Sequence, residues 1–173
     1  MFGVHTFKNG DSALGLSIGF RNSYDRSLSI GIATGSSVFV CDNLCLSGDL
    51  TVLRKHTTNV LDDINGLALS AIYKSRSAFN QIKADAEVMK QIPMTDDEAY
   101  RMLGLIYGRG IINPRMIPVV KKEWLDPSHD AFEERNLWSF YNAVTESLKS
   151  SPPQSILERH LAIHKQLMNH VAA

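Results

Sequence analysis

Cysteine is scarce in this sequence, and long apolar runs are missing. Cys41 and Cys45 are the only two cysteines among 173 residues, which is too few for the disulfide framework of a small secreted protein. The first eight residues lack the apolar core of a signal peptide. No run of about 18 apolar residues occurs, although a membrane-spanning helix would need one. These absences predict a soluble, cytoplasmic protein that does not enter a membrane.

Net charge is lacking as well, because 18 basic residues balance 18 acidic ones. Dedicated nucleic-acid binders usually carry a basic excess, since much of their affinity comes from displacing the counterions of phosphates. The overall balance therefore argues against that class unless basic residues gather locally. The 44% share of hydrophobic residues is ordinary for a globular protein, and we expect one domain over residues 1–173.

Alternating apolar residues in the first quarter of the chain predict β-strands. Turn-forming residues follow at 21–27 and again at 33–37. The segment 44–46 fits either a short strand or a helical turn. The apolar positions that define the three expected strands are Leu14, Leu16, Ile18 and Phe20, then Leu28, Ile30 and Ile32, then Val38 to Cys41. We expect an antiparallel three-stranded meander over about residues 10–45.

From about residue 57 the apolar period lengthens to three or four residues, as in an amphipathic helix. A long helix is expected from Asn59 to Pro93, and a second one from Thr95, where Glu98 completes the capping-box spacing. Residues 108–118 contain two glycines and two prolines and predict a loop. Two more helices are expected over 130–148 and 154–170. The predicted fold class is therefore α+β, with a helical region at about 57–172. The stripe of the long helix consists of Val60, Ile64, Leu67, Ala71, Ile72, Phe79, Ile82, Ala86 and Met89.

Residues suited to catalysis or metal binding do not form a known motif. Cys41 and Cys45 lack the second ligand pair of a zinc site, which favours buried thiols. His160 and His164 lie one helical turn apart, but two histidines leave a metal short of ligands, and we expect partly exposed helix residues. Gly104, Gly108 and Gly110 (with no Lys-Ser pair after them) do not form a phosphate loop. We therefore predict no catalytic residue, no metal and no cofactor.

Carboxylates cluster at residues 96–98 and 126–134. Both clusters lie near expected helix starts, where negative charge is stabilising without any catalytic role. Acid–base or metal-assisted catalysis would require two of them to meet in a pocket, which the sequence alone does not reveal. An enzyme, for example a divalent-ion nuclease, stays a minor hypothesis on this basis.

The strongest local signal is basic. Between residues 100 and 122 there is no acidic residue, and Arg21 and Arg26 at the first turn extend the set. Such residues bind phosphate, and an aromatic ring stacks on an unpaired base. The alternative is that these charges pair with the acidic segments 96–98 and 126–134. The segment 100–122 supplies Arg101, Tyr107, Arg109, Arg115, Lys121 and Lys122 to the predicted nucleic-acid site.

Two short segments carry a resemblance to a known family. Residues 19–27 (Gly-Phe-Arg-Asn-Ser-Tyr-Asp-Arg-Ser) and 38–43 (Val-Phe-Val-Cys-Asp-Asn) resemble a family of uncharacterised proteins called phage/plasmid-like. In that family one strand ends in an Arg-Asn-Ser turn, and a later strand ends in Val-Cys followed by Asn. The resemblance covers the N-terminal third and implies a mobile-element origin, without supplying catalytic residues. Separately, three strands followed by a long helix are similar to the core of phage single-strand annealing proteins, an analogy of fold only.

Two functions are therefore weighed. The first is a non-enzymatic accessory protein of a phage or plasmid that binds nucleic acid, with single strands as the expected ligand. The second is an inhibitor that binds a host protein of a defence system, of the anti-restriction or anti-CRISPR type. Apolar helix stripes of this strength are also compatible with a homo-oligomer.

Overall fold

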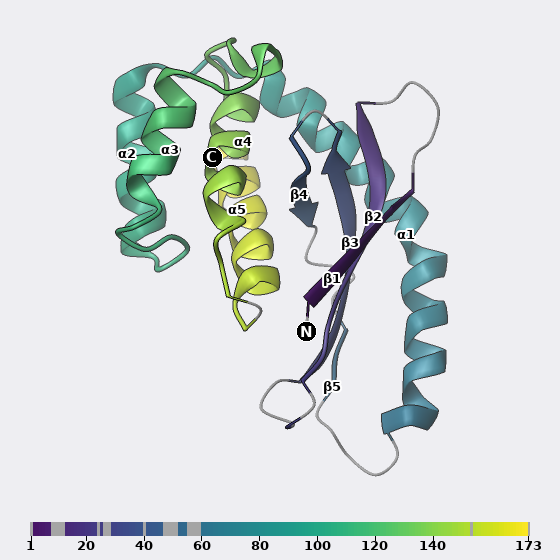
Figure 1. Ribbon diagram of the computed structural model, residues 1–173. Helices are drawn as coiled ribbons and strands as arrows, with labels where there is room; N and C mark the ends of the chain where they lie inside the picture. Colours follow the sequence, from purple (N-terminus) through teal and green to yellow (C-terminus); the bar gives the residue numbers. More distant parts are fainter. Residues whose placement is uncertain are drawn as a thin grey trace.

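The N-terminal third of the chain forms an antiparallel sheet, and the rest forms helices that lie beside and behind it (Figure 1). This computed structural model describes residues 2–7, 13–23, 25, 29–39, 41–46, 52–54, 60–152 and 154–172. The predicted α+β class is confirmed, with strands first and helices after them.

The described residues form a sheet of five strands, so the number of strands in the expected three-stranded meander is wrong. The path runs β1-β2-β3-β4, and β5 pairs with the early part of β3, at Ile30–Ile32, whereas β4 pairs with the later part. The segment 44–46 lies in β4. The strands are β1 (Phe2–Phe7), β2 (Leu14–Arg21), β3 (Ile30–Val38), β4 (Asn43–Leu46) and β5 (Val52–Arg54).

The segment 33–37 is not a turn. β3 continues straight through it, pairing with β2 on one side and with β4 on the other. All five residues are buried, and their small side chains allow neighbouring backbones to approach closely. A β-carbon on Gly35 would lie 2.9 Å from the Leu46 Cα and against the carbonyl oxygen of Cys45. Small residues, which are typical of loops, are therefore found here because the neighbouring strands pack closely.

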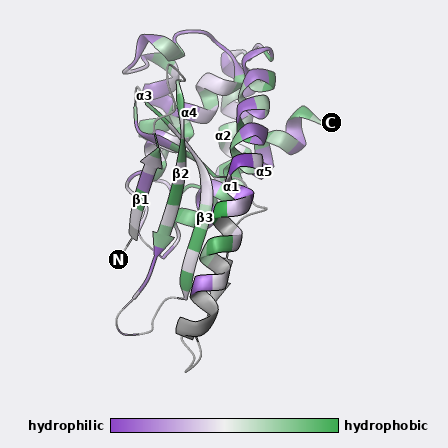
Figure 2. Ribbon diagram, turned by 90° about the vertical axis from the view of Figure 1, so that its right-hand side faces the viewer, coloured by the Kyte–Doolittle hydropathy of each residue, from purple (hydrophilic) through white to green (hydrophobic). Residues whose placement is uncertain are grey.

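One face of the sheet packs against α1 (Val60–Lys90), which lies behind it in Figure 1. The alternation of β2 places Leu14 and Leu16 on this face, where they join the core with Phe79 and Ile82. Ile72 lies on the same helix stripe as Phe79, but it is 54% exposed, which corrects its expected burial. Among the described residues of α1, those that belong to the hydrophobic core lie in the second half of the helix. Figure 2 shows hydrophobic colouring on β2, β3 and α1.

Among the described residues, four further α-helices form the second part of the molecule, with a short 3-10 helix at Asp130–Phe132 before the third of them. The α-helices are α2 (Asp96–Gly108), α3 (Ile117–Leu125), α4 (Leu137–Leu148) and α5 (Ile156–Val171). α2 begins with the predicted capping box of Thr95 and Glu98. α3 was not predicted, because Pro118 suggested a loop, yet proline is tolerated in a first helical turn. The helix expected over 130–148 begins only at Leu137, since Asn136 caps it by accepting from the Ser139 N–H at 2.9 Å.

α5 packs against the sheet at β3 and β4 and connects both parts of the fold. Ile156 and Leu157 pack with Ala33 and Leu46 of the sheet, while further along α5 His164 contacts Asp85 of α1. In the part of the chain that the structure describes, no helix is long and apolar enough to cross a membrane.

Candidate functional site

The basic residues of α2 lie along its contact with α5. Residues 101, 105 and 109 share one flank of α2, because positions three to four apart are neighbours on a helix. Arg109 Nη1 donates to Gln166 Oε1 of α5, and Arg101 and His170 line one hollow. Beyond the end of α2, Arg159 Nη1 lies 3.2 Å from Met116 Sδ. The name α2–α5 seam is used here for Arg101, Leu105 and Arg109 of α2 together with Arg159, Gln166 and His170 of α5.

Most of the predicted cations are exposed and lack an acidic partner. Arg101, Arg109, Arg115 and Lys121 are exposed, and none of the ion pairs between described residues involves them. Lys122 is different, because its Nζ lies 3.0 Å from Glu123 Oε1 and 2.6 Å from Ser128 Oγ. None of these four cations therefore forms an ion pair with a described carboxylate, although the charge of Arg101 adds to the Thr95 hydrogen bonds that lower the pKa of Glu98.

Arg21 lies apart from this group. Its guanidinium is buried and forms a two-pronged ion pair with Glu158, with N–O distances of 2.6 and 2.7 Å. It also donates to the Gln154 carbonyl at 2.8 Å. These bonds join the end of β2 to the start of α5, a structural role that leaves Arg21 outside the proposed interface. Arg26 lies outside the described residues.

Tyr107 does not face the same way as the arginines. It is 46% exposed, but at 100° per residue it lies about 120° around α2 from Arg101. Tyr100, seven residues earlier, shares the flank of Tyr107, on the side where Asp96 accepts from Trp124 Nε1 of α3. The structure therefore separates the predicted stacking ring from the predicted phosphate contacts.

Sequence reasoning missed the contribution of α5 to the basic surface. Arg159, Gln166 and His170 are seven and four residues apart, so they form one flank of that helix. This spacing was visible in the sequence, but nothing there indicated that the flank would face α2. Only the tertiary fold places residues such as Arg109 and Gln166, which are 57 positions apart, on one surface.

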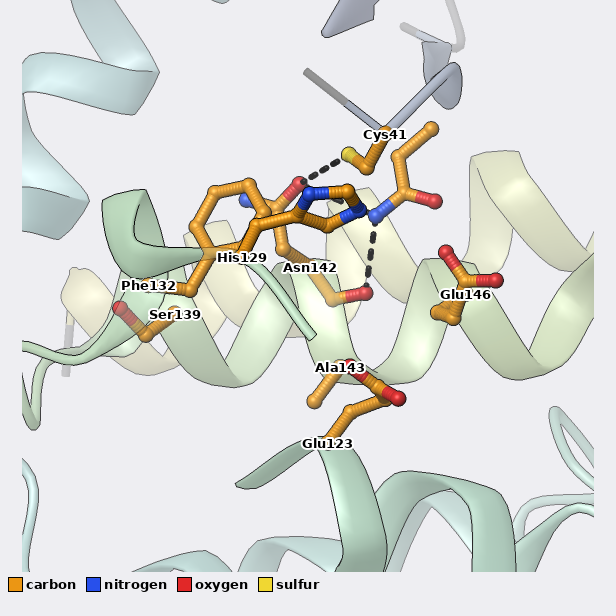
Figure 3. A pocket seen from close by; sticks show the side chains of 9 residues that line it. Cys41, Glu123, His129, Phe132, Ser139, Asn142, Ala143 and Glu146 are labelled. Carbon is orange, nitrogen blue, oxygen red and sulfur yellow. Dashed lines mark hydrogen bonds between the residues drawn. The ribbon is translucent and has the colours of Figure 1, made fainter. Parts of the chain in front are cut away.

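A second candidate is the polar pocket of Figure 3, where Cys41, His129 and Asn142 meet. These residue types resemble the set that activates a nucleophilic thiol. Asn142 is nevertheless occupied, because its Oδ1 and its backbone oxygen accept from Asn43 at 3.2 and 3.1 Å. Burial raises the pKa of Cys41 to about 11, so the thiol stays protonated at neutral pH. The cavity of about 10 Å³ has room for one water at most.

His160 and His164, expected to be partly exposed, are both buried. His164 Nε2 lies 3.1 Å from Asp85 Oδ2, and Asp85 Oδ1 accepts from Gln81 at 2.8 Å. Burial lowers the pKa of His164, although Asp85 opposes the shift, and burial lowers that of His160 to about 4. Both rings are neutral at pH 7 and fill core positions. Their one-turn spacing therefore reflects a buried helix face.

The two cysteines are buried thiols, as the sequence indicated. Burial raises the pKa of Cys45 to about 12, and it also raises the pKa of the neighbouring Tyr141. Among the described residues, no group of three or more His, Cys, Asp or Glu side chains is placed to hold a metal ion.

Comparison with known proteins adds a family but no activity. No solved structure matches this chain. A family model described as Domain of unknown function (DUF932) matches residues 5–162, so the family likeness extends over nearly the whole chain and not only over its N-terminal third. This protein therefore belongs to the DUF932 family of unknown function.

Proposed function

We propose that this protein binds nucleic acid, single strands above all, along the α2–α5 seam, and that it catalyses no reaction there. The observation that carries the proposal is the row of arginines at the seam that form no ion pair with a described carboxylate, in a protein whose formal net charge is zero. Phosphate contacts of this kind supply most of the non-specific affinity for nucleic acid. Consistent with the sequence resemblance, we place the protein among the accessory proteins of a phage or plasmid.

The geometry of the seam suits an extended strand. Arg101 and Arg109 are eight residues apart, which corresponds to about 12 Å along the helix axis. Arg159 extends the line beyond the end of α2, since its Nη1 contacts Met116 in the segment that follows α2. A flexible single strand follows a row of positive charges more readily than a stiff duplex does.

Reversing two of these charges tests the proposal. The double variant Arg101→Glu, Arg109→Glu is expected to bind a fluorescent single-stranded oligonucleotide at least tenfold more weakly at 50 mM salt. It should also flatten the dependence of affinity on salt, because each lost phosphate contact reduces the slope of log K against log[salt] by roughly 0.7 for single strands. Fluorescence anisotropy across a salt series measures both quantities.

The matched control is Lys74→Glu, Lys83→Glu on α1, where both lysines are exposed. This pair makes the same change in net charge far from the seam in the sequence, and it should leave the affinity within about twofold. Equal losses in the two double variants would mean that only total charge matters. Wild-type protein with no salt-sensitive binding at all would refute the proposed function.

A protein partner is the second candidate, and the exposed apolar side of α1 favours it. Leu69, Ile72 and Tyr73 are 56%, 54% and 85% exposed, and they are neighbours at helical spacing. Contiguous apolar residues of this kind mark interaction surfaces more often than scattered ones do. As a host-defence inhibitor, the protein would bind its target through this side of α1.

Ile72→Asp with Tyr73→Asp tests this second candidate. From nuclease-treated host lysate, immobilised wild type should retain a stoichiometric protein that the double variant loses, because two carboxylates at the centre of the apolar contact must be desolvated. Circular dichroism checks that the variant is folded. Retention of the same protein by both chains would exclude this surface as the contact.

A further inference from the structure

A hollow of about 310 Å³ lies between α2 and the C-terminal end of α5, at one end of the α2–α5 seam. The hollow is large enough for a planar ring system, since ligand pockets begin at about 300 Å³. The residues that line it are Met94, Glu98, Arg101, Met102, Leu105 and His170.

The lining combines an apolar part with polar groups at its margin. Met94 and Met102 are 95% buried, and Leu105 is partly exposed beside them. Thioether sulfurs contact aromatic faces favourably and adapt to irregular shapes. The apolar part therefore suits an aromatic ring inserted with its face against Met94, Met102 and Leu105.

The polar groups at the margin determine which substituents on the ring would be bound. Arg101 and His170 offer N–H donors, and neither forms an ion pair with a described carboxylate. Both lie near enough to Glu98 to add to the Thr95 hydrogen bonds that lower its pKa. Glu98 accepts from the Thr95 backbone and hydroxyl through Oε2, both at 2.7 Å. Its Oε1 is left to accept a hydrogen bond from a ligand. An aromatic ring with an amino group, attached to phosphate, meets all three requirements.

We infer that the hollow binds one unpaired base of a single strand, with Glu98 accepting from its exocyclic amine and Arg101 and His170 contacting the adjoining phosphates. The inference rests on the proposed function and adds the ligand class to it. In a duplex the base is stacked and paired, so its face and amine are not available. The hollow would thus give the preference for single strands that a row of arginines alone does not provide.

Filling the hollow tests the inference. Leu105→Trp places a larger ring in it, and because Leu105 is already 39% exposed the variant should fold. We expect a roughly tenfold loss of affinity for a single-stranded oligo-dC, because base stacking is removed. Affinity for a hairpin duplex of equal charge should not change. Tyr107→Trp, on the other flank of α2, is the matched control and should alter neither affinity.

Base identity provides an independent readout. The amine of cytosine is a donor, whereas the corresponding oxygen of thymine is an acceptor, so oligo-dC should bind at least threefold more tightly than oligo-dT. Free cytidine monophosphate should displace the strand only at concentrations at least a hundredfold higher, because it makes too few phosphate contacts. Equally tight binding of the mononucleotide would assign the hollow to a free nucleotide instead.

The possible outcomes distinguish a failure of the base site from a failure of the proposed function. A wild-type protein that binds neither strand form refutes the proposed function. A wild-type protein that binds nucleic acid, but whose affinity for oligo-dC is unchanged in Leu105→Trp, overturns the base site and leaves the seam intact. Equal loss of single-strand and duplex affinity in Leu105→Trp would also overturn it, since the substitution would then have disturbed the phosphate contacts.

Discussion

Replacing Gly35 with alanine is expected to destabilise the fold by about 3 kcal/mol, the upper range for overpacking a close-packed site. The added methyl would meet the carbonyl oxygen of Cys45 and lie 2.9 Å from the Leu46 Cα. Both obstacles are backbone atoms of β4, which cannot rotate away as a side chain can. The β3–β4 pairing would have to shift, and with it the burial of Leu46 and the packing of Ile156.

Urea denaturation followed by circular dichroism measures this loss. Gly104→Ala is the matched control, because a β-carbon at Gly104 would meet nothing within 4 Å. Gly104 also lies inside α2, where alanine is preferred over glycine by about 0.5–1 kcal/mol. The control should therefore be stabilised slightly. If both variants unfolded at the same urea concentration, the close approach of β4 to β3 would be wrong.

The second large effect is a loss of stability in mild acid. The pKa of His160 falls from 6.5 to about 4 on folding because the ring is buried. Below pH 6.5 the unfolded chain therefore binds a proton at this ring that the folded chain does not bind. The contribution to the free energy of unfolding is fully present above pH 6.5 and declines as the pH falls towards 4. From this one residue we expect a loss of about 2 kcal/mol between pH 7 and pH 5. His164, whose pKa is also lowered, acts in the same direction.

His160→Gln isolates this contribution. The glutamine does not titrate, so the difference in unfolding free energy between pH 7 and pH 5 should shrink by about 2 kcal/mol, whatever the stability of the variant at pH 7. His5→Gln, at an exposed position of β1, is the control and should retain the wild-type difference. Unfolding midpoints in urea at the two pH values decide the matter. A His160→Gln protein that loses stability in acid as steeply as wild type would contradict this account.

The fold class and the capping of α2 followed from local patterns. Alternation identified β2, and the Thr95–Glu98 spacing identified the start of α2, because both signals come from residues close together in the chain. The segment 33–37 was misjudged for a physical reason. Small residues favour turns in isolation, but they are also required where two strands leave no room for a side chain, and only the position of β4 distinguishes the cases.

The candidate site was only partly predictable. The stretch without acidic residues between positions 100 and 122 left open whether its cations would be exposed or paired, and it includes Lys122, which pairs with Glu123 in the next position. Arg21 could not be excluded from the sequence, because its partner Glu158 is 137 residues away. Burial of His160 and His164 likewise depends on how α5 lies across β4 and α1. Local patterns carry no information on contacts of this range.

The bond between Arg21 and Glu158 also bears on how quickly the molecule forms. Contacts between such distant parts of a chain require a large loop to close before any energy is gained, and proteins dominated by them fold slowly. The contacts of α3 with α4 and of α4 with α5 join segments that follow one another in the chain, so they should form early. Docking of α5 onto the sheet is then expected to be the late event of folding, and until it occurs the apolar residues Ala33 and Leu46 remain open to solvent.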